Sequence, residues 1–138
     1  MKQHFLDANV VLDFALSREP YSLEAQTIFS LVELEKVKAG ISMITIPILD
    51  YFIKKEYRLQ ERKALLTTIK QLAQILPATQ ESLDWALTSK FTDLEDAIQN
   101  HIAESNGYTT IITRNKKDFK HSNLSILTPG ELLSTLEL

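Results

Sequence analysis

Residues 92–113, TDLEDAIQNHIAESNGYTTIIT, contain the clearest pattern of secondary structure in the chain. Apolar residues recur at helical spacing in the first half, and this predicts an amphipathic helix over 92–105. Asn106 and Gly107 then form a typical helix stop. The β-branched residues of 109–113 predict a strand. A helix that leads directly into a strand is therefore expected here.

The same alternation of helices and strands extends outward over the rest of the chain. Further strands are expected at 4–6, 41–45, 75–76 and 124–127. Further helices are expected at 10–15, 22–35, 47–57, 61–76, 82–89 and from 128 onward. Residues 75–76 therefore fit either the end of a helix or a short strand. Ala39 and Gly40 are expected to break the chain before the second strand. This alternation predicts an α/β fold, a three-layer sandwich in which helices flank a central parallel sheet of four or five strands.

Length and composition exclude several classes of protein. The chain has 138 residues, which suits one domain spanning 1–138. It has no cysteine, which excludes a disulfide framework, a thiolate zinc site and a cysteine nucleophile. No apolar run is long enough to span a membrane and no signal peptide is evident, so we expect a cytoplasmic protein. The net charge of -3 excludes a general basic coat but not a local patch that binds nucleic acid.

Polar side chains follow two of the expected strands. Asp7 and Asn9 come after the first strand, and Thr113, Arg114 and Asn115 come after a later one. In parallel sheets, ligands bind beyond the carboxyl ends of the strands, so these residues are expected to gather in one site. A carboxylate such as Asp7 in this position could hold a metal or a substrate. It could also simply cap the next helix.

Three acids are concentrated at the start of the helix expected over 92–105. Thr92 and Glu95 fit a capping box, which leaves Asp93 and Asp96 without a structural role. Because they are three residues apart, these two carboxylates lie on one side of the helix. They could share a divalent ion with Asp7 if the beginning of the helix borders the site.

The loop after the strand at 109–113 combines oxygen ligands with positive charge. Asn115 and Asp118 could ligate a metal, and Arg114, Lys116 and Lys117 could contact phosphates. The same run of charges also fits a solvated turn, and both interpretations remain open.

Other polar or aromatic residues have simpler interpretations. Asp13 is expected on the solvated face of the first helix, and His101 and Trp85 are expected to pack against apolar neighbours. Residues 51–58 interleave aromatic rings with positive charges, which suits either a surface that faces RNA or a half-buried helix, and the helix is favoured.

The types of candidate ligand indicate the chemistry. Carboxylate and amide oxygens, with no cysteine and few histidines, favour Mg²⁺ or Mn²⁺ over zinc. Clustered carboxylates with such ions commonly hydrolyse phosphodiesters, because the metal lowers the pKa of a bound water and stabilises the departing oxygen.

The motifs together resemble those of the PIN domain, the fold of many VapC-type toxin nucleases. Residues 5–13 are similar to the opening strand of the family, 95–99 to the helix with its third acid, and 111–119 to its last motif. The resemblance runs over nearly the whole chain in the right order. It implies a single-strand ribonuclease that depends on magnesium or manganese, is often a homodimer, and is often inhibited by a small antitoxin protein.

The resemblance also assigns roles to residues. It implies that the first metal-binding acid is Asp7, that the third is Asp96 with Asp93 as a frequent companion, and that the fourth polar position is Asn115 with Asp118 nearby.

The second acid of the family is missing, because its position falls on Ile48. Asp50 lies two residues further, about 200° around a helix, and would face nearly away.

The resulting hypothesis is a metal-dependent ribonuclease, possibly the toxin of a toxin–antitoxin pair. Asp7 and Asp96 would bind the ion directly, and the residues that complete the shell through water would be Asp93, Asn115 and Asp118. Asn9 and Thr113 would hold the carboxylates or the attacking water, and the residues that contact phosphates would be Arg114, Lys116 and Lys117. The alternative is a degenerate PIN-fold module that binds RNA or a protein partner, which the isoleucine at position 48 favours.

Overall fold

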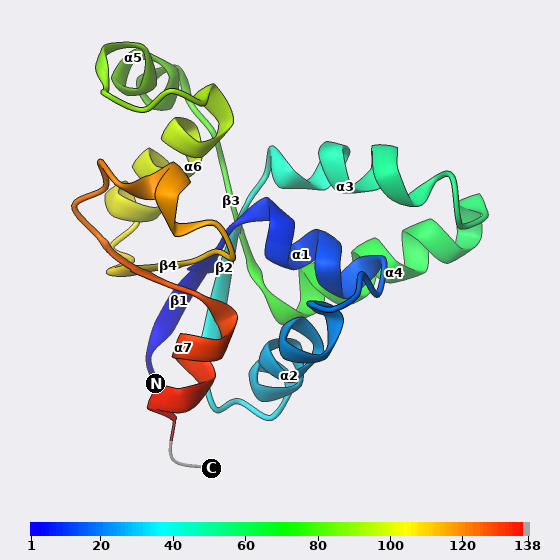
Figure 1. Ribbon diagram of the computed structural model, residues 1–138. Coiled ribbons are helices and arrows are strands. Elements are labelled where there is room, and N and C mark those ends of the chain that lie inside the picture. The colour runs from blue at the N-terminus through cyan, green and yellow to red at the C-terminus, as the bar shows by residue number, and fades with distance from the viewer. Residues whose placement is uncertain (137–138) are drawn as a thin grey trace.

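The computed structural model describes residues 1–136 and contains a five-stranded parallel sheet between two layers of helices (Figure 1). The strand order is β3-β2-β1-β4-β5. The strands are β1 (Gln3–Leu6), β2 (Lys38–Ser42), β3 (Gln74–Leu76), β4 (Thr110–Ile112) and β5 (Ser125–Leu127). The predicted α/β sandwich is therefore confirmed, with the larger of the two expected strand numbers.

Helices connect each strand to the next. They are α1 (Ala8–Ala15), α2 (Ser22–Glu33), α3 (Thr45–Ile53), α4 (Leu59–Leu72), α5 (Gln80–Thr88), α6 (Leu94–Ser105) and α7 (Pro129–Thr135), with a 3-10 helix η1 (Lys116–Phe119). Helices α1 to α4 and α7 cover one face of the sheet, while α6 and η1 cover the other and α5 packs on α6 (Figure 1).

Alternation along the strands divides the core into two layers. In β1, Leu6 packs among side chains of α1 to α4, whereas Phe5 packs against α6 and η1, and both are fully buried. The neighbouring strand β4 repeats this pattern with Ile112 and Ile111. Successive side chains of a strand point to opposite faces, so a strand buried on both sides must be apolar throughout.

The second strand begins three residues earlier than predicted, because Gly40 lies inside it rather than before it. The ring of Tyr108 packs directly over Gly40, and a Cβ atom at this position would clash with that ring. The Tyr108 hydroxyl donates a hydrogen bond to Gln74 Oε1 of β3 at 2.9 Å. The glycine therefore permits a close approach across the sheet instead of breaking the chain.

Several predicted helix boundaries shift as well. Helix α3 begins at Thr45, two residues earlier than predicted, and ends at Ile53 rather than near Tyr57. Helix α4 ends at Leu72, so the strand interpretation of residues 75–76 is the right one. Among residues 1–136, no helix combines the length and the apolar character that crossing a membrane requires.

Candidate active site

Asp7 lies at the carboxyl end of β1 and is 4% exposed. Its Oδ1 accepts a hydrogen bond from Gln99 Nε2 at 2.9 Å, and its Oδ2 accepts one from Thr113 Oγ1 at 2.7 Å. Asp7 occupies the N-cap position of α1, but its side chain makes no capping hydrogen bond. The carboxylate is thus oriented toward α6 and the end of β4, and capping does not explain its presence.

The hydroxyl of Thr113 connects three segments at this edge. It donates to Asp7 and accepts from the backbone N–H of Asn115 at 3.1 Å and, more weakly, from Asn9 Nδ2 at 3.4 Å. Thr113 is fully buried directly after β4, which is the neighbour of β1 in the sheet. The strand order therefore brings together the polar residues that follow the two strands.

Gln99 was not recognised from the sequence as part of this edge. It is fully buried in α6, and its amide both donates to Asp7 and accepts from the backbone N–H of Ala8 at 3.2 Å. It lies three residues after Asp96 and therefore on the same side of the helix. That spacing is the one signal that could have identified it, since a polar residue at a buried helical position needs a partner.

The beginning of α6 differs from the predicted capping box. The helix begins at Leu94, and Asp93 is its N-cap, with Oδ1 accepting from the Asp96 backbone N–H at 3.0 Å. Thr92 is exposed and Glu95 is half-buried, so these two do not form the predicted box. Aspartate is as good a cap as threonine, and the helix uses the later of the two residues. Asp93 therefore caps the helix, a role that the prediction had given to Thr92 and Glu95.

The carboxylates at this edge repel one another. Burial, and then the charges of Asp7, Asp93, Asp118 and Glu95, raise the pKa of Asp96 to about 8. Burial also raises the pKa of Asp7, although hydrogen bonds from Thr113, Gln99 and the Ala8 N–H oppose this change. The pKa of Glu95 is raised by burial and by Asp7 and Asp93. Negative charge from β1, α6 and η1 thus converges at one place.

The loop after β4 remains largely exposed. Asn115, Lys117 and Asp118 are exposed, and Asp118 is close enough to contribute to the raised pKa of both Asp7 and Asp96. Lys116 Nζ contacts Glu131 Oε1 at 3.1 Å. The loop therefore adds the Asp118 carboxylate to the cluster and carries two exposed lysines, Lys116 and Lys117.

Asp13 is 2% exposed, so the prediction of a solvated position is wrong. Its carboxylate pairs with Arg18 Nε and with Arg114 Nε, each at 2.8 Å. The guanidinium of Arg114 also lies 4.1 Å from the centre of the Tyr21 ring. The loop that leaves β4 contacts this part of α1 through Arg114, so the acid is paired with one local and one distant arginine. Arg114, predicted to contact phosphates, thus has a carboxylate partner in α1.

Within residues 1–136, neither Ile48 nor Asp50 adds a carboxylate to the cluster where the resemblance expects a second acid. Ile48 is half-buried in α3. Asp50 Oδ1 pairs with Arg62 Nε of α4 at 3.5 Å, and Asp50 is not among the charges that raise the pKa of Asp7 or Asp96. The expected rotation of Asp50 away from the cluster agrees with this contact.

The donor atoms of this cluster are of the type that binds a hard divalent cation. Carboxylate oxygens are the ligands that Mg²⁺ and Mn²⁺ prefer, and a bound cation would relieve the repulsion that raises the pKa of Asp96. The residues that could hold such an ion are Asp7, Asp93 and Asp96. Within the described residues 1–136, however, no three His, Asp or Glu side chains are placed closely enough to enclose a metal.

The aromatic residues are more exposed than predicted. Trp85 is half-buried, outside the core, and its ring lies 5.6 Å from His101 between ring centres. The rings of Tyr51 and Phe52 are 53% and 39% exposed at the end of α3, with Lys54 Nζ 4.9 Å from the centre of the Tyr51 ring. The predicted helix is present there, but its aromatic rings face outward.

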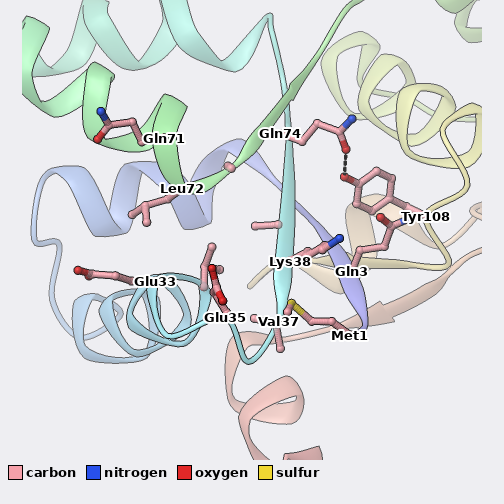
Figure 2. Close-up of a pocket in the computed structure, with 13 residues that line it drawn as sticks. Met1, Gln3, Glu33, Glu35, Val37, Lys38, Gln71, Leu72, Gln74 and Tyr108 are labelled. Atoms are coloured by element: carbon pink, nitrogen blue, oxygen red, sulfur yellow. Dashed lines mark hydrogen bonds between the residues drawn. The ribbon is translucent and has the colours of Figure 1, made fainter.

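A hollow of about 560 Å³ lies at the opposite edge of the sheet, where the strands begin (Figure 2). It is lined by residues that include Glu33, Lys38, Gln74 and Tyr108, and Figure 2 shows the hydrogen bond between the last two. None of the carboxylates described above lines it. The candidate site is therefore the exposed carboxyl edge and not this hollow.

Comparisons with known proteins agree with the fold. The family model of the PIN domain matches residues 3–117. A toxin–antitoxin complex from Klebsiella pneumoniae contains a chain that is 26% identical, with a TM-score of 0.68 over 91% of this chain and 97% of that one. VapBC2 from Rickettsia felis, bound to a DNA fragment from its promoter, gives 16% identity and a TM-score of 0.66 over 91% and 98%.

FitAcB from Neisseria gonorrhoeae is similar in fold as well, at 20% identity and a TM-score of 0.63 over 92% of this chain and 98% of that one. No curated protein matches the chain. Because the family model covers most of the sequence and the structure has the corresponding sheet, this chain belongs to the PIN domain family.

Proposed function

We propose that this chain is a ribonuclease that hydrolyses phosphodiester bonds of single-stranded RNA with Mg²⁺ or Mn²⁺. The observation that supports this most strongly is the convergence of Asp7, Asp93, Asp96 and Asp118, where burial, and then the neighbouring charges, raise the pKa of Asp96 to about 8. A bound cation would stabilise the ionised form of such a cluster. Membership of the PIN domain family supports the same class of reaction.

The proposed roles follow from the contacts. Asp7 and Asp96 would hold the ion directly, and the residues that complete its shell through water would be Asp93, Asn115 and Asp118. When bound, the ion would lower the pKa of a water and stabilise charge on the phosphoryl oxygens. Gln99 and Thr113 fix the Asp7 carboxylate in one orientation, and Asn9 supports Thr113.

The positive side chains after β4 would contact RNA phosphates to different extents. Arg114 and Lys116 have carboxylate partners in Asp13 and Glu131, which compete with a phosphate. Lys117 is exposed beside them and would contribute most.

The biological partner would be an antitoxin protein. The solved structures of similar fold include a toxin–antitoxin complex at 26% identity, and this supports the role of a toxin. A homodimer and a cytoplasmic location belong to the same proposal, and no described helix could anchor the chain in a membrane.

A second function is favoured by one specific observation. Ile48 stands where the family has its second acid, and Asp50 is engaged with Arg62 instead of joining the cluster. With fewer carboxylates than an active site of the family, the chain would be a module that binds RNA or a protein without cutting it.

An RNA cleavage assay distinguishes the ribonuclease from the binding module. The purified chain is incubated with total RNA and Mn²⁺ or Mg²⁺, and new 5′ ends are mapped by sequencing, so that even a narrow target is detected. The nuclease predicts cut sites that disappear in Asp7→Asn and Asp96→Asn but persist in Asp84→Asn, an exposed acid of α5. Binding of RNA without any new ends would support the module instead.

A further inference from the structure

A pocket of about 320 Å³ lies between the α5–α6 connection and the segment after η1, a volume at the lower end of ligand sites. It is lined by Trp85, Thr88, Ser89, Lys90, Phe91 and His121.

Two of the segments that line the pocket also carry carboxylates of the cluster. Phe91 lies two residues before Asp93, and His121 lies three residues after Asp118. Cα atoms two residues apart are separated by at most about 7.6 Å. Both walls are therefore continuous with segments that carry carboxylates of the candidate site.

The aromatic wall of the pocket is held in place by further rings. The Trp85 ring lies 5.9 Å from the Phe91 ring and 5.6 Å from the His101 ring, measured between ring centres. Phe91 in turn packs edge-to-face on the buried Phe119 at 5.9 Å. A half-buried ring fixed on several sides offers a preformed surface for stacking.

The rim of the pocket is polar and carries positive charge. Lys90 is exposed beside the aromatic wall, and His121 is exposed across from it. The hydroxyls of Thr88 and Ser89 donate to backbone carbonyls of α5 and keep a lone pair for a ligand. The pocket thus combines a stacking face, hydrogen-bonding groups and a cation.

We propose that this pocket binds one nucleobase of a single-stranded RNA, next to the phosphate that lies at the carboxylate cluster. Stacking on Trp85 would hold the base, and Lys90 and His121 would contact the flanking phosphates. This proposal rests on the proposed ribonuclease function. It adds a contact that determines which phosphate of the RNA lies at the carboxylate cluster. An acidic protein segment would match the lysine but would make little use of the flat aromatic face.

The pocket can be observed directly, because Trp85 is the only tryptophan of the chain. We would titrate the protein with octanucleotides of A, C or U in EDTA, which prevents metal-dependent cleavage, and record tryptophan emission. A saturable change is expected, and one base should bind most tightly. Lys90→Ala and His121→Ala should each weaken binding several-fold, whereas Lys70→Ala, an exposed lysine of α4, should not. Trp85→Ala, followed with labelled RNA, should weaken binding about tenfold.

The outcomes separate this proposal from the function on which it rests. Unchanged emission with an RNA that the protein cuts in Mn²⁺ would overturn the base pocket and leave the ribonuclease intact. Binding that requires Lys90 and His121, without cleavage in any metal, would support the pocket and contradict the ribonuclease. Equal binding by the Lys70 and Lys90 variants would also overturn the pocket, as would an emission change with an acidic peptide but not with RNA.

Discussion

Asp7 is buried in a setting that satisfies both of its oxygens. Gln99 contacts Asp7 on one side and the Ala8 N–H on the other, so a single amide connects α6 to the junction of β1 and α1. A buried group that loses its hydrogen-bond partner costs about 1–3 kcal/mol. The contribution of Gln99 to stability should therefore be measurable without any substrate.

Gln99→Ala is expected to lower the free energy of unfolding by about 1–3 kcal/mol, because two buried groups lose their partner. Urea denaturation followed by circular dichroism measures this change. Gln71→Ala, an exposed glutamine of α4, serves as the control and should change stability by less than about 0.5 kcal/mol. Equal effects of the two substitutions would show that the Gln99 amide does not stabilise the site.

The raised pKa of Asp96 should make stability depend on pH. An unfolded aspartate ionises near 3.8, whereas Asp96 in the folded chain ionises near 8. Between these values the folded state binds more protons, so stability should fall as pH rises, and Asp7 and Glu95 act in the same direction.

Asp96→Asn removes the part of this dependence that Asp96 contributes. In EDTA, the variant should gain more thermal stability over the native chain at pH 8 than at pH 5. Thermal unfolding of both proteins across this range measures the difference. A gain that is the same at all pH values would mean that neither burial nor repulsion within the cluster raises the pKa of Asp96.

In β2, a contact with a residue far away in the sequence explains why a glycine lies inside the strand. Gly40 lies inside the strand because Tyr108, which follows α6, packs over it. We expect Gly40→Ala to destabilise the fold by about 1–3 kcal/mol through overpacking. Gly130→Ala is the matched control, since its Cβ would meet only the flexible end of Glu24. Equal denaturation midpoints for the two variants would contradict the proposed role of the close approach.

Local patterns predicted the elements and much of the site, and they failed where distant segments meet. Helical and strand periodicity placed most elements, and the rule for parallel sheets placed Asp7 and Thr113 together. The burial of Asp13 depends on Arg114, which follows β4 a hundred residues later. Gln99 and Gly40 likewise derive their roles from partners far away in the sequence. No periodicity within one element contains that information.

In the whole molecule, the order of the strands brings the residues of the candidate site together, and Ile48 leaves it with fewer carboxylates than the proposed function expects. Neighbouring strands β1 and β4 bring their polar ends together, and α6 adds further carboxylates. The proposed function expects a further carboxylate from α3, but the resemblance places that acid at Ile48, and Asp50 pairs with Arg62. The metal affinity of the native chain should therefore be lower than a complete set of acids would allow.

Ile48→Glu should restore the missing carboxylate and tighten Mn²⁺ binding several-fold. Asp50→Asn is the matched control and should leave Mn²⁺ binding unchanged, because Asp50 contacts Arg62. Calorimetry on both variants measures these affinities. Loss of binding in Asp50→Asn would instead show that Asp50 reaches the ion.

The first measurement to make is calorimetry of Mn²⁺ binding to the native chain, to Asp7→Asn and to Asp84→Asn. The proposed site predicts that the native chain and Asp84→Asn bind the ion and that Asp7→Asn does not. Equal binding by Asp7→Asn, or no binding by the native chain at millimolar Mn²⁺, would contradict a metal centre at the carboxyl edge of the sheet.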